Sequence, residues 1–259
     1  MKDFDIKLVK KLAIEAGQAI MKIYQTDFDV AYKGDQSPLT LADQKANEII
    51  VDGLGKAYPD YAILSEEVAD DKSRRLNDYC FIVDPLDGTK EFINRNGEFT
   101  VNIALVYHGK PVVGVIYVPV TKQLYVAVKG EGAFREDTDS DEVKQLKVSE
   151  KTRDLVWIGS KSHSSEKEAQ LIVTHQDLIG ESIVAGSSLK GCRVAEGNAD
   201  VYYRFGLTCE WDTAAMQCIV EEAGGIFRQM DGTEMVYNRE NTLNEKGFYV
   251  VNQSQNIWV

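Results

Sequence analysis

The sequence of 259 residues predicts an α/β protein with two lobes, an α+β lobe over residues 1–152 and an α/β lobe over residues 153–259. The first part of the chain combines two helical patterns with a block of closely spaced segments rich in Val, Ile, Tyr and Thr. In the second part, short apolar strands alternate with helices, which is typical of α/β folds. A chain of this length is sufficient for two modest lobes, and we expect the site in a cleft between them.

Each element of the first lobe has its own pattern. Apolar residues at helical spacing predict helices over residues 4–25 and 38–58. The apolar segments "AIL" at 62–64 and "CFIVD" at 80–84 predict two strands, the second of them buried. Residues 99–135 predict an antiparallel meander of about four strands, because turn sequences with glycine or proline interrupt a β-rich stretch.

After residue 153 the predicted strands and helices alternate regularly. The strands are "LVWIGS", "SIVAG", "ADVYYRF", "GGIF" and "KGFYVVN", and the helices cover residues 164–173, 187–197 and 213–223. None of the cysteines forms a CxxC pair, so we expect free thiols in a reducing compartment and no structural zinc site. These cysteines are Cys80, Cys192, Cys209 and Cys218.

The formal net charge of −12 argues against a nucleic-acid polymer as partner, because the sequence contains no basic patch to offset it. A small anionic substrate would need local cations or a bound metal. No apolar run is long enough to span a bilayer, and the charged N-terminus lacks the features of a signal peptide. We therefore expect a cytoplasmic protein, with loose association at the inner membrane face left open.

The stretch "FIVDPLDGTKEF" carries two aspartates, Asp84 and Asp87, directly after a buried strand. Pro85 is expected to end the ladder of strand hydrogen bonds. Backbone N–H groups of Gly88, Thr89 and the next residue can form an anion-binding nest at a helix start, which would place metal and phosphate side by side. The alternative is an ordinary Asx-turn, and these residues alone leave both interpretations open.

Three further acidic residues have simple local interpretations. Glu66 belongs to an acidic pair after a strand, which is usually at the surface. Asp43 fits a variant capping box with Thr40. Asp212 fits a helix N-cap, although Trp211 beside it indicates partial burial, and a bound metal would offset the cost of an unpaired buried carboxylate.

Two cationic residues follow in the second lobe. Lys190 lies in the first turn of the helix that begins in "GSSLKGC", where its charge opposes the helix dipole and favours an anionic ligand nearby. Arg204 lies near the end of "ADVYYRF" and, taken alone, is interpreted as a surface charge. The GxSxG, Walker A and helix-borne GxGxxG motifs are absent from the sequence.

Together these segments resemble a known family. "VDPLDGTKEF" and "WDTAAMQCIVEEAGG" look like the paired signatures of the inositol monophosphatase superfamily, and "SPLTLADQKAN", "ILSEE", "GSKSH" and "GSSLK" match in order, so the resemblance covers essentially the whole chain. Within it, the sequence is most similar to the CysQ-type 3′(2′),5′-bisphosphate nucleotidases. One departure is Gly191-Cys192, where an aromatic residue often follows the lysine, which leaves nucleoside packing in doubt.

The resemblance implies a layered αβαβα fold and a phosphatase with two or three Mg²⁺ per site. The implied reaction converts adenosine 3′,5′-bisphosphate to AMP and phosphate, in sulfur assimilation and nucleotide recycling, with 3′-phosphoadenylylsulfate as a second substrate. The implied metal ligands are Glu66, Asp84, Asp87, Asp212 and the carbonyl of Leu86. The residues implied to orient the attacking water are Asp43 and Thr89. The implied substrate contacts are Gly88 and Thr89 for the scissile phosphate, His163 for the base, and Ser187, Lys190 and Arg204 for the 5′-phosphate.

Two alternatives stay open at this point. One is an inositol monophosphatase or fructose-1,6-bisphosphatase, although inositol phosphatases tend to carry a small or apolar residue at the lysine position. The other is a regulator that binds metal or nucleotide without catalysis, against which stands the complete set of acidic residues. The expected partner is a small nucleotide bisphosphate, and the sequence leaves the choice between monomer and homodimer open.

Overall fold

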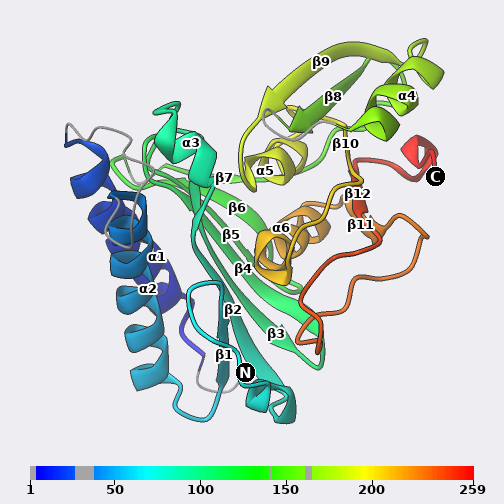
Figure 1. Cartoon of the computed structure of the whole chain (residues 1–259). Coiled ribbons are helices and arrows are strands. Elements are labelled where there is room, and N and C mark those ends of the chain that lie inside the picture. Colours follow the sequence, from blue (N-terminus) through cyan, green and yellow to red (C-terminus); the bar gives the residue numbers. More distant parts are fainter. Residues whose placement is uncertain (1–3, 27–37, 141, 161–164) are drawn as a thin grey trace.

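The computed structural model describes residues 4–26, 38–140, 142–160 and 165–259. Layers of helix and sheet alternate in the order α, β, α, β, α (Figure 1). One cluster of buried apolar side chains lies between α1, α2 and the large sheet, one surrounds the central helices and reaches both sheets, and one lies on the outer face of the small sheet. This is the layered arrangement that the resemblance implied.

Within the described residues, the large sheet has seven strands in chain order, and only the first pair is parallel. Strands β3 to β6 are the antiparallel meander predicted from the sequence. The strands are β1 (Ala62–Ser65), β2 (Tyr79–Asp87), β3 (Thr100–Tyr107), β4 (Lys110–Val118), β5 (Gln123–Val128), β6 (Gly132–Asp137) and β7 (Val143–Gln145). A short 3₁₀ helix, η1 (Ser73–Leu76), lies in the connection from β1 to β2.

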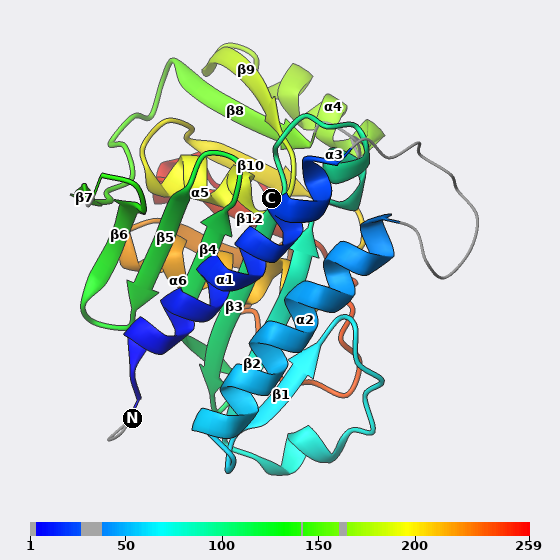
Figure 2. The same cartoon turned by 90° about the vertical axis from the view of Figure 1, so that its left-hand side faces the viewer.

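Two long helices, α1 (Ile6–Tyr24) and α2 (Pro38–Ala57), cross the outer face of the large sheet (Figure 2). Their apolar positions recur at helical spacing, so each helix presents one buried stripe to the sheet. Val9 and Ile50 belong to these stripes and share a core with Val101 of β3. Both helices predicted from the sequence are confirmed.

Helices α5 (Leu189–Ala195) and α6 (Glu210–Glu222) fill the layer between the two sheets. Most of α6 is buried because it packs against both sheets, and Ile219 shares one apolar cluster with Ile82 and Val250. Gly114 of β4 allows the helix backbone to approach closely, since a Cβ there would lie 2.4 Å from the carbonyl oxygen of Ala215. This close contact fixes the height of α6 above the sheet.

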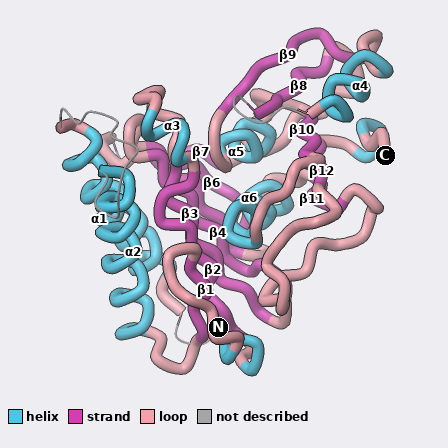
Figure 3. Tube along the Cα trace, viewed as in Figure 1, coloured by secondary structure: helices cyan, strands magenta, loops and turns pink. Residues whose placement is uncertain are grey.

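The smaller sheet completes the fold, with strand order β11-β12-β10-β8-β9 over the part of the chain that the structure describes. Helix α4 (Glu166–Thr174) and the C-terminal end of the chain lie over its outer face (Figure 3), where Leu171 and Trp258 pack against the buried cluster. The strands are β8 (Leu155–Ser160), β9 (Ile179–Ala185), β10 (Val201–Arg204), β11 (Ile226–Gln229) and β12 (Phe248–Val251), and a final 3₁₀ helix, η2, spans Ser254–Asn256. Every strand and helix predicted for the second lobe is confirmed.

The division into lobes over 1–152 and 153–259 stays a prediction, because the cluster around α6 combines residues from both parts of the chain. The cysteines are free thiols, and three of them are buried. Among the described helices, none combines the length and the apolar character needed to cross a membrane.

Candidate active site

The end of β2 brings Asp84 and Asp87 to the same place. In a regular strand, residues three apart point to opposite faces of the sheet. Here Asp84 pairs with Asn102 while Asp87 pairs with Thr100, so β2 holds one residue more than β3 over this stretch, which is a β-bulge. The predicted end of this strand at Asp84 is wrong, because β2 continues to Asp87, whereas the ladder is interrupted at Pro85 as expected for a residue that cannot donate to it.

Asp212 reaches these two residues from the first turn of α6. The helix begins at Glu210 with Cys209 as N-cap, so the interpretation of Asp212 as the N-cap is wrong. Its carboxylate instead accepts the backbone N–H of Cys209 at 2.5 Å. One carboxylate oxygen from each of Asp84, Asp87 and Asp212 lies within 4.8 Å of the other two.

This acidic cluster carries a large electrostatic cost. Burial raises the pKa of Asp84 well above its usual range, and repulsion from Asp87 and Glu66 adds to the effect. Burial and the Asp87 charge likewise raise the pKa of Asp212. Three converging carboxylates are hard oxygen donors, the ligand type of Mg²⁺, Ca²⁺ and Mn²⁺, and a divalent cation would offset their repulsion. The residues present therefore fit a divalent metal.

Three hydrogen bonds from two neighbouring elements, β3 and the start of α5, fix the Asp87 carboxylate. Its Oδ2 accepts the Ser188 hydroxyl at 2.6 Å, the Ser188 backbone N–H at 2.7 Å and the Asn102 side-chain amide at 3.1 Å. Sequence reasoning missed Ser188 and Asn102 in this role. The available signal was the position of Asn102, a polar residue inside the apolar strand β3, where it is 1% exposed.

Glu66 stands next to the cluster at the parallel pair β1 and β2. Its backbone N–H donates to the carbonyl of Val83 at 3.2 Å, which places it beside Asp84. Although the residue as a whole is exposed, the protein around its carboxyl group and the Asp87 charge raise its pKa to about 7. The electrostatics thus connect Glu66 with the cluster, whereas its sequence context alone favoured a surface position.

Asp43 faces the same region from α2. Burial, followed by repulsion from Glu67 and Glu66, raises its pKa to about 8. The capping-box interpretation is wrong, because α2 already begins at Pro38 and Asp43 lies inside the helix. The side chain of Thr40 lies outside the described residues.

The turn after β2 leads directly into a short helix, α3 (Thr89–Ile93), as predicted. Gly88 is its N-cap, with a φ of 99° in the left-handed region. A Cβ at Gly88 would lie 3.2 Å from the carbonyl oxygen of Glu98, so both the backbone angle and the space favour glycine. The backbone N–H groups of Gly88 and Thr89 stand at this helix start.

A cavity of about 270 Å³ adjoins the acidic cluster and contains the predicted cationic residues. Lys190 is buried there, and its ammonium group donates to the carbonyl of Ser187 at 2.6 Å and lies 5.6 Å from the centre of the Tyr202 ring. Burial lowers the pKa of this lysine, while the Asp87 charge opposes the shift. The predicted site residues that line the cavity are Asp87, Ser187, Lys190, Arg204 and Asp212. His163 lies outside the described residues.

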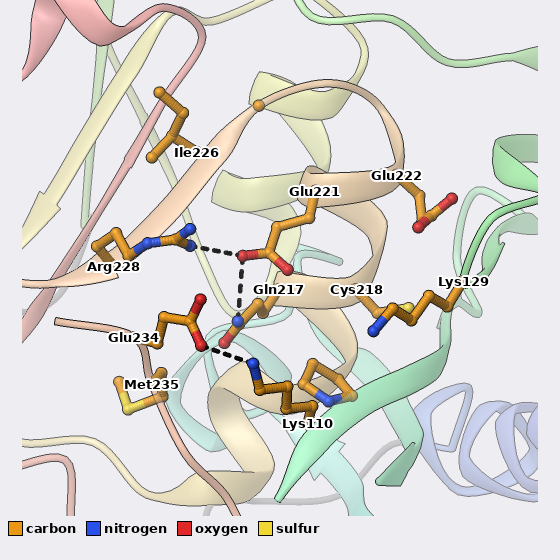
Figure 4. Close-up of a pocket in the computed structure, with 12 residues that line it drawn as sticks. Lys110, Lys129, Gln217, Cys218, Glu221, Glu222, Ile226, Arg228, Glu234 and Met235 are labelled. Atoms are coloured by element: carbon orange, nitrogen blue, oxygen red, sulfur yellow. Dashed lines mark hydrogen bonds and ion pairs between the residues drawn. The ribbon is translucent and has the colours of Figure 1, made fainter. Parts of the chain in front are cut away.

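A second cavity, of about 330 Å³, lies near the other end of α6 (Figure 4). Two ion pairs flank it, Lys110 with Glu234 at 2.9 Å and Arg228 with Glu221 at 2.8 Å. The protein thus neutralises most of this charge internally. None of the predicted site residues that the structure describes lines this cavity, which separates it from the acidic cluster.

Comparisons with known proteins agree with this site. Residues 2–257 match the inositol monophosphatase family. The 3′(2′),5′-bisphosphate nucleotidase CysQ of Escherichia coli K12 is 43% identical over 248 residues, which cover 93% of this chain and 97% of that protein. The CysQ nucleotidase of Salmonella typhimurium is 42% identical over 95% of this chain and 98% of its own. The crystal structure of CysQ from Bacteroides thetaiotaomicron superposes with a TM-score of 0.88 at 39% identity, covering 98% of this chain and 100% of that chain.

Proposed function

Because the chain belongs to the inositol monophosphatase family, we propose that it is a Mg²⁺-dependent phosphatase that converts adenosine 3′,5′-bisphosphate to AMP and phosphate. The observation that carries the proposal is the shared cavity of Asp87, Asp212, Lys190 and Arg204. Carboxylates at one side suit a metal-bound phosphate, and two cations at the other suit a second phosphate. Similarity to curated CysQ nucleotidases supports the same substrate class.

The acidic residues would hold two or three Mg²⁺ ions. We assign Asp84, Asp87 and Asp212 to this role, together with Glu66 and the backbone carbonyl of Leu86. When bound, the metal ions supply the positive charge that stabilises an attacking water, the phosphoryl group and the leaving 3′-oxygen. The hydrogen bonds to Asp87 Oδ2 keep one carboxylate in a fixed orientation for this purpose.

Asp43 and Thr89 are proposed to orient the attacking water. Asp43 retains a proton near neutral pH while no cation is bound, because its pKa is about 8, and a cation nearby would favour its ionised, proton-accepting form. The Gly88 and Thr89 N–H groups at the start of α3 would hold the scissile phosphate. Hydrolysis then requires attack in line with the 3′-oxygen, on the side of the phosphate opposite the ribose.

Ser187, Lys190 and Arg204 are proposed to bind the 5′-phosphate. Lys190 is buried and held by two backbone carbonyls, so its charge is already oriented before substrate arrives. Gly206 leaves room for Arg204, since a Cβ at that glycine would lie 3.0 Å from the guanidinium carbon. The phosphoric–sulfuric anhydride 3′-phosphoadenylylsulfate carries the same 3′-phosphate and is the proposed second substrate, with sulfur assimilation as the setting.

A phosphate-release assay tests the proposal. With Mg²⁺ present, adenosine 3′,5′-bisphosphate should be hydrolysed much faster than inositol 1-phosphate or fructose 1,6-bisphosphate, and chelation should stop the reaction. Lys190→Met should raise KM for the bisphosphate at least tenfold, while the KM for 3′-AMP, which has no 5′-phosphate, should change little. A preference for inositol 1-phosphate or fructose 1,6-bisphosphate would replace the proposal with that activity, and nucleotide binding without turnover would favour the non-catalytic regulator. Cytoplasmic location and the choice between monomer and homodimer stay predictions.

A further inference from the structure

The start of α6 is bound along its outer side by residues 238–244, which we call the brace segment. The backbone N–H of Glu210 donates to the carbonyl of Thr242 at 2.9 Å, and that of Asn244 donates to the carbonyl of Thr208 at 2.8 Å. The Asn244 side-chain amide donates to the carbonyl of Cys209 at 2.8 Å. These bonds hold the residues that lead into Asp212 as a strand-like pair with the brace segment.

A fully buried carboxylate, that of Glu210, stabilises the contact between the start of α6 and the brace segment. The Glu210 side chain is 0% exposed. One oxygen accepts the backbone N–H of Arg239 at 2.9 Å and the Arg239 Nε–H at 3.0 Å. The other oxygen accepts the backbone N–H of Asn238 at 2.7 Å. The carboxylate therefore binds only the brace segment in these contacts, two residues before Asp212.

The same segment also binds the connection after β1, which begins with Glu66. Arg74 of η1 is 4% exposed and donates to the Asn238 side-chain oxygen at 2.7 Å and to the Arg239 carbonyl at 2.8 Å. Its guanidinium also holds Asp70 at 2.8 and 3.1 Å. Through these bonds, η1 is joined to the connection between β11 and β12, which is orange to red in Figure 1.

Asp84 and Asp87 need no such support, because they share one strand. Asp212 and Glu66 arrive on separate elements, α6 and the connection after β1, and a carboxylate oxygen of Asp212 lies within 4.8 Å of one from each of Asp84 and Asp87. Groups that repel each other stay close only when the surrounding protein opposes the repulsion. The brace segment joins both elements and contains none of the proposed ligands.

We infer that Glu210, Arg239 and Arg74 are positioning residues, which through the brace segment set the distance between Asp212 and Glu66 and so preorganise the divalent-cation site. This inference rests on the proposed metal-ligand roles. Residues that orient ligands from behind typically change metal affinity 10- to 100-fold when they are replaced. The contacts of the brace segment differ from a purely structural ion pair in one respect. Loss of these contacts should weaken cation binding, whereas loss of a structural ion pair elsewhere should lower only the stability of the fold.

Glu210→Gln tests the inference, because glutamine keeps the size of the side chain but its NH₂ group cannot accept an N–H bond. Calorimetric titration with Mg²⁺, without substrate, should give at least a tenfold weaker affinity. The Mg²⁺ concentration for half-maximal activity should rise in parallel. The KM for bisphosphate at saturating Mg²⁺ should stay within about twofold, because Lys190 and Arg204 are untouched.

Glu196→Gln is the matched control. Glu196 is also a buried glutamate, with Arg135 at 2.8 Å and Arg193 at 2.9 Å, but it lies at the end of α5 and has no contact with the brace segment among its hydrogen bonds. The Glu196→Gln substitution should lower Tm and leave the Mg²⁺ affinity unchanged. If the Glu210→Gln variant fails to fold, the Arg74→Lys variant tests the inference instead. A single lysine ammonium cannot replace the guanidinium bonds to Asp70, Asn238 and Arg239 together.

Wild-type Mg²⁺ affinity in a folded Glu210→Gln or Arg74→Lys variant, with only Tm reduced, would overturn the inference. An equal loss of affinity in the Glu196→Gln control would overturn it as well, because the effect would then follow from general destabilisation. Asp212→Asn is titrated in parallel. Unchanged Mg²⁺ binding in that variant would instead refute the proposed metal-ligand role of Asp212, so the two failures are distinguishable.

Discussion

Replacing Asp43 by asparagine should stabilise the cation-free protein while it removes activity. The carboxyl has a pKa of about 8 in the folded protein, against an ordinary value of 3.8. Between these two values the folded protein retains a proton that the unfolded chain releases, so stability falls as pH rises through this window. Asparagine does not titrate, and the Asp43→Asn substitution removes that loss.

The magnitude follows from the size of the shift. Four pKa units at 1.36 kcal/mol each correspond to an upper limit of about 6 kcal/mol above pH 8, and to about 4 kcal/mol at pH 7. Asp43 is only partly buried, so solvent screening reduces the gain, and we expect about 1–3 kcal/mol at pH 8. Below about pH 3 the gain should vanish, because both states then hold the proton.

Urea unfolding in EDTA at pH 5, 6.5 and 8 measures the effect. Asp52→Asn is the control, since Asp52 lies on the same helix with a side chain that is 72% exposed, and its change in unfolding free energy should be small and independent of pH. Turnover of Asp43→Asn should fall by about 10²–10⁴, the usual contribution of a group that handles the proton. A stability difference between Asp43→Asn and the wild type that stays constant or shrinks as pH rises would refute the reasoning.

Two further predictions concern the same site. Cation affinity should increase from pH 6 to pH 8. Glu66 and Asp43, with pKa values of about 7 and 8, lose protons over this range, and protons compete with the metal. Calorimetric Mg²⁺ titrations that give the same affinity across this range would contradict the prediction. Gly88→Ala should cost about 1–2 kcal/mol of unfolding free energy, because alanine is strained at a φ of 99°, and it should raise KM. The matched Gly55→Ala change, in open space on α2, should instead add about 0.5–1 kcal/mol in the same urea unfolding assay; equal effects would count against the strain.

Local patterns predicted most of the secondary structure. The strands β3 to β6 and the helices α1 and α2 are recognisable because apolar periodicity and turn residues act within a few positions. The β-bulge between Asp84 and Asp87 was missed, because the register with β3 depends on residues more than ten positions away. Local reasoning placed the end of the strand at Asp84, before Pro85, although the strand continues to Asp87.

The site was only partly predictable for the same reason. The resemblance implied the acidic and cationic residues, and the structure adds that Asp87, Asp212, Lys190 and Arg204 line one cavity. Glu210 could not be recognised, since an acidic residue at a helix start usually faces solvent, and only the fold brings Arg239 to it. The brace segment has no periodicity of its own and therefore no sequence signal.

The position of α6 also has a consequence for synthesis of the protein. The inner face of the large sheet, with Ile82 and Ile116, is covered by α6, whose last residue, Glu222, lies 85 residues beyond the last residue of β6, Asp137. At the usual speed of translation, that face emerges roughly 4–17 s before the helix that covers it. The nascent chain must therefore carry a broad apolar sheet surface without its partner, which makes it a natural client for a ribosome-associated chaperone.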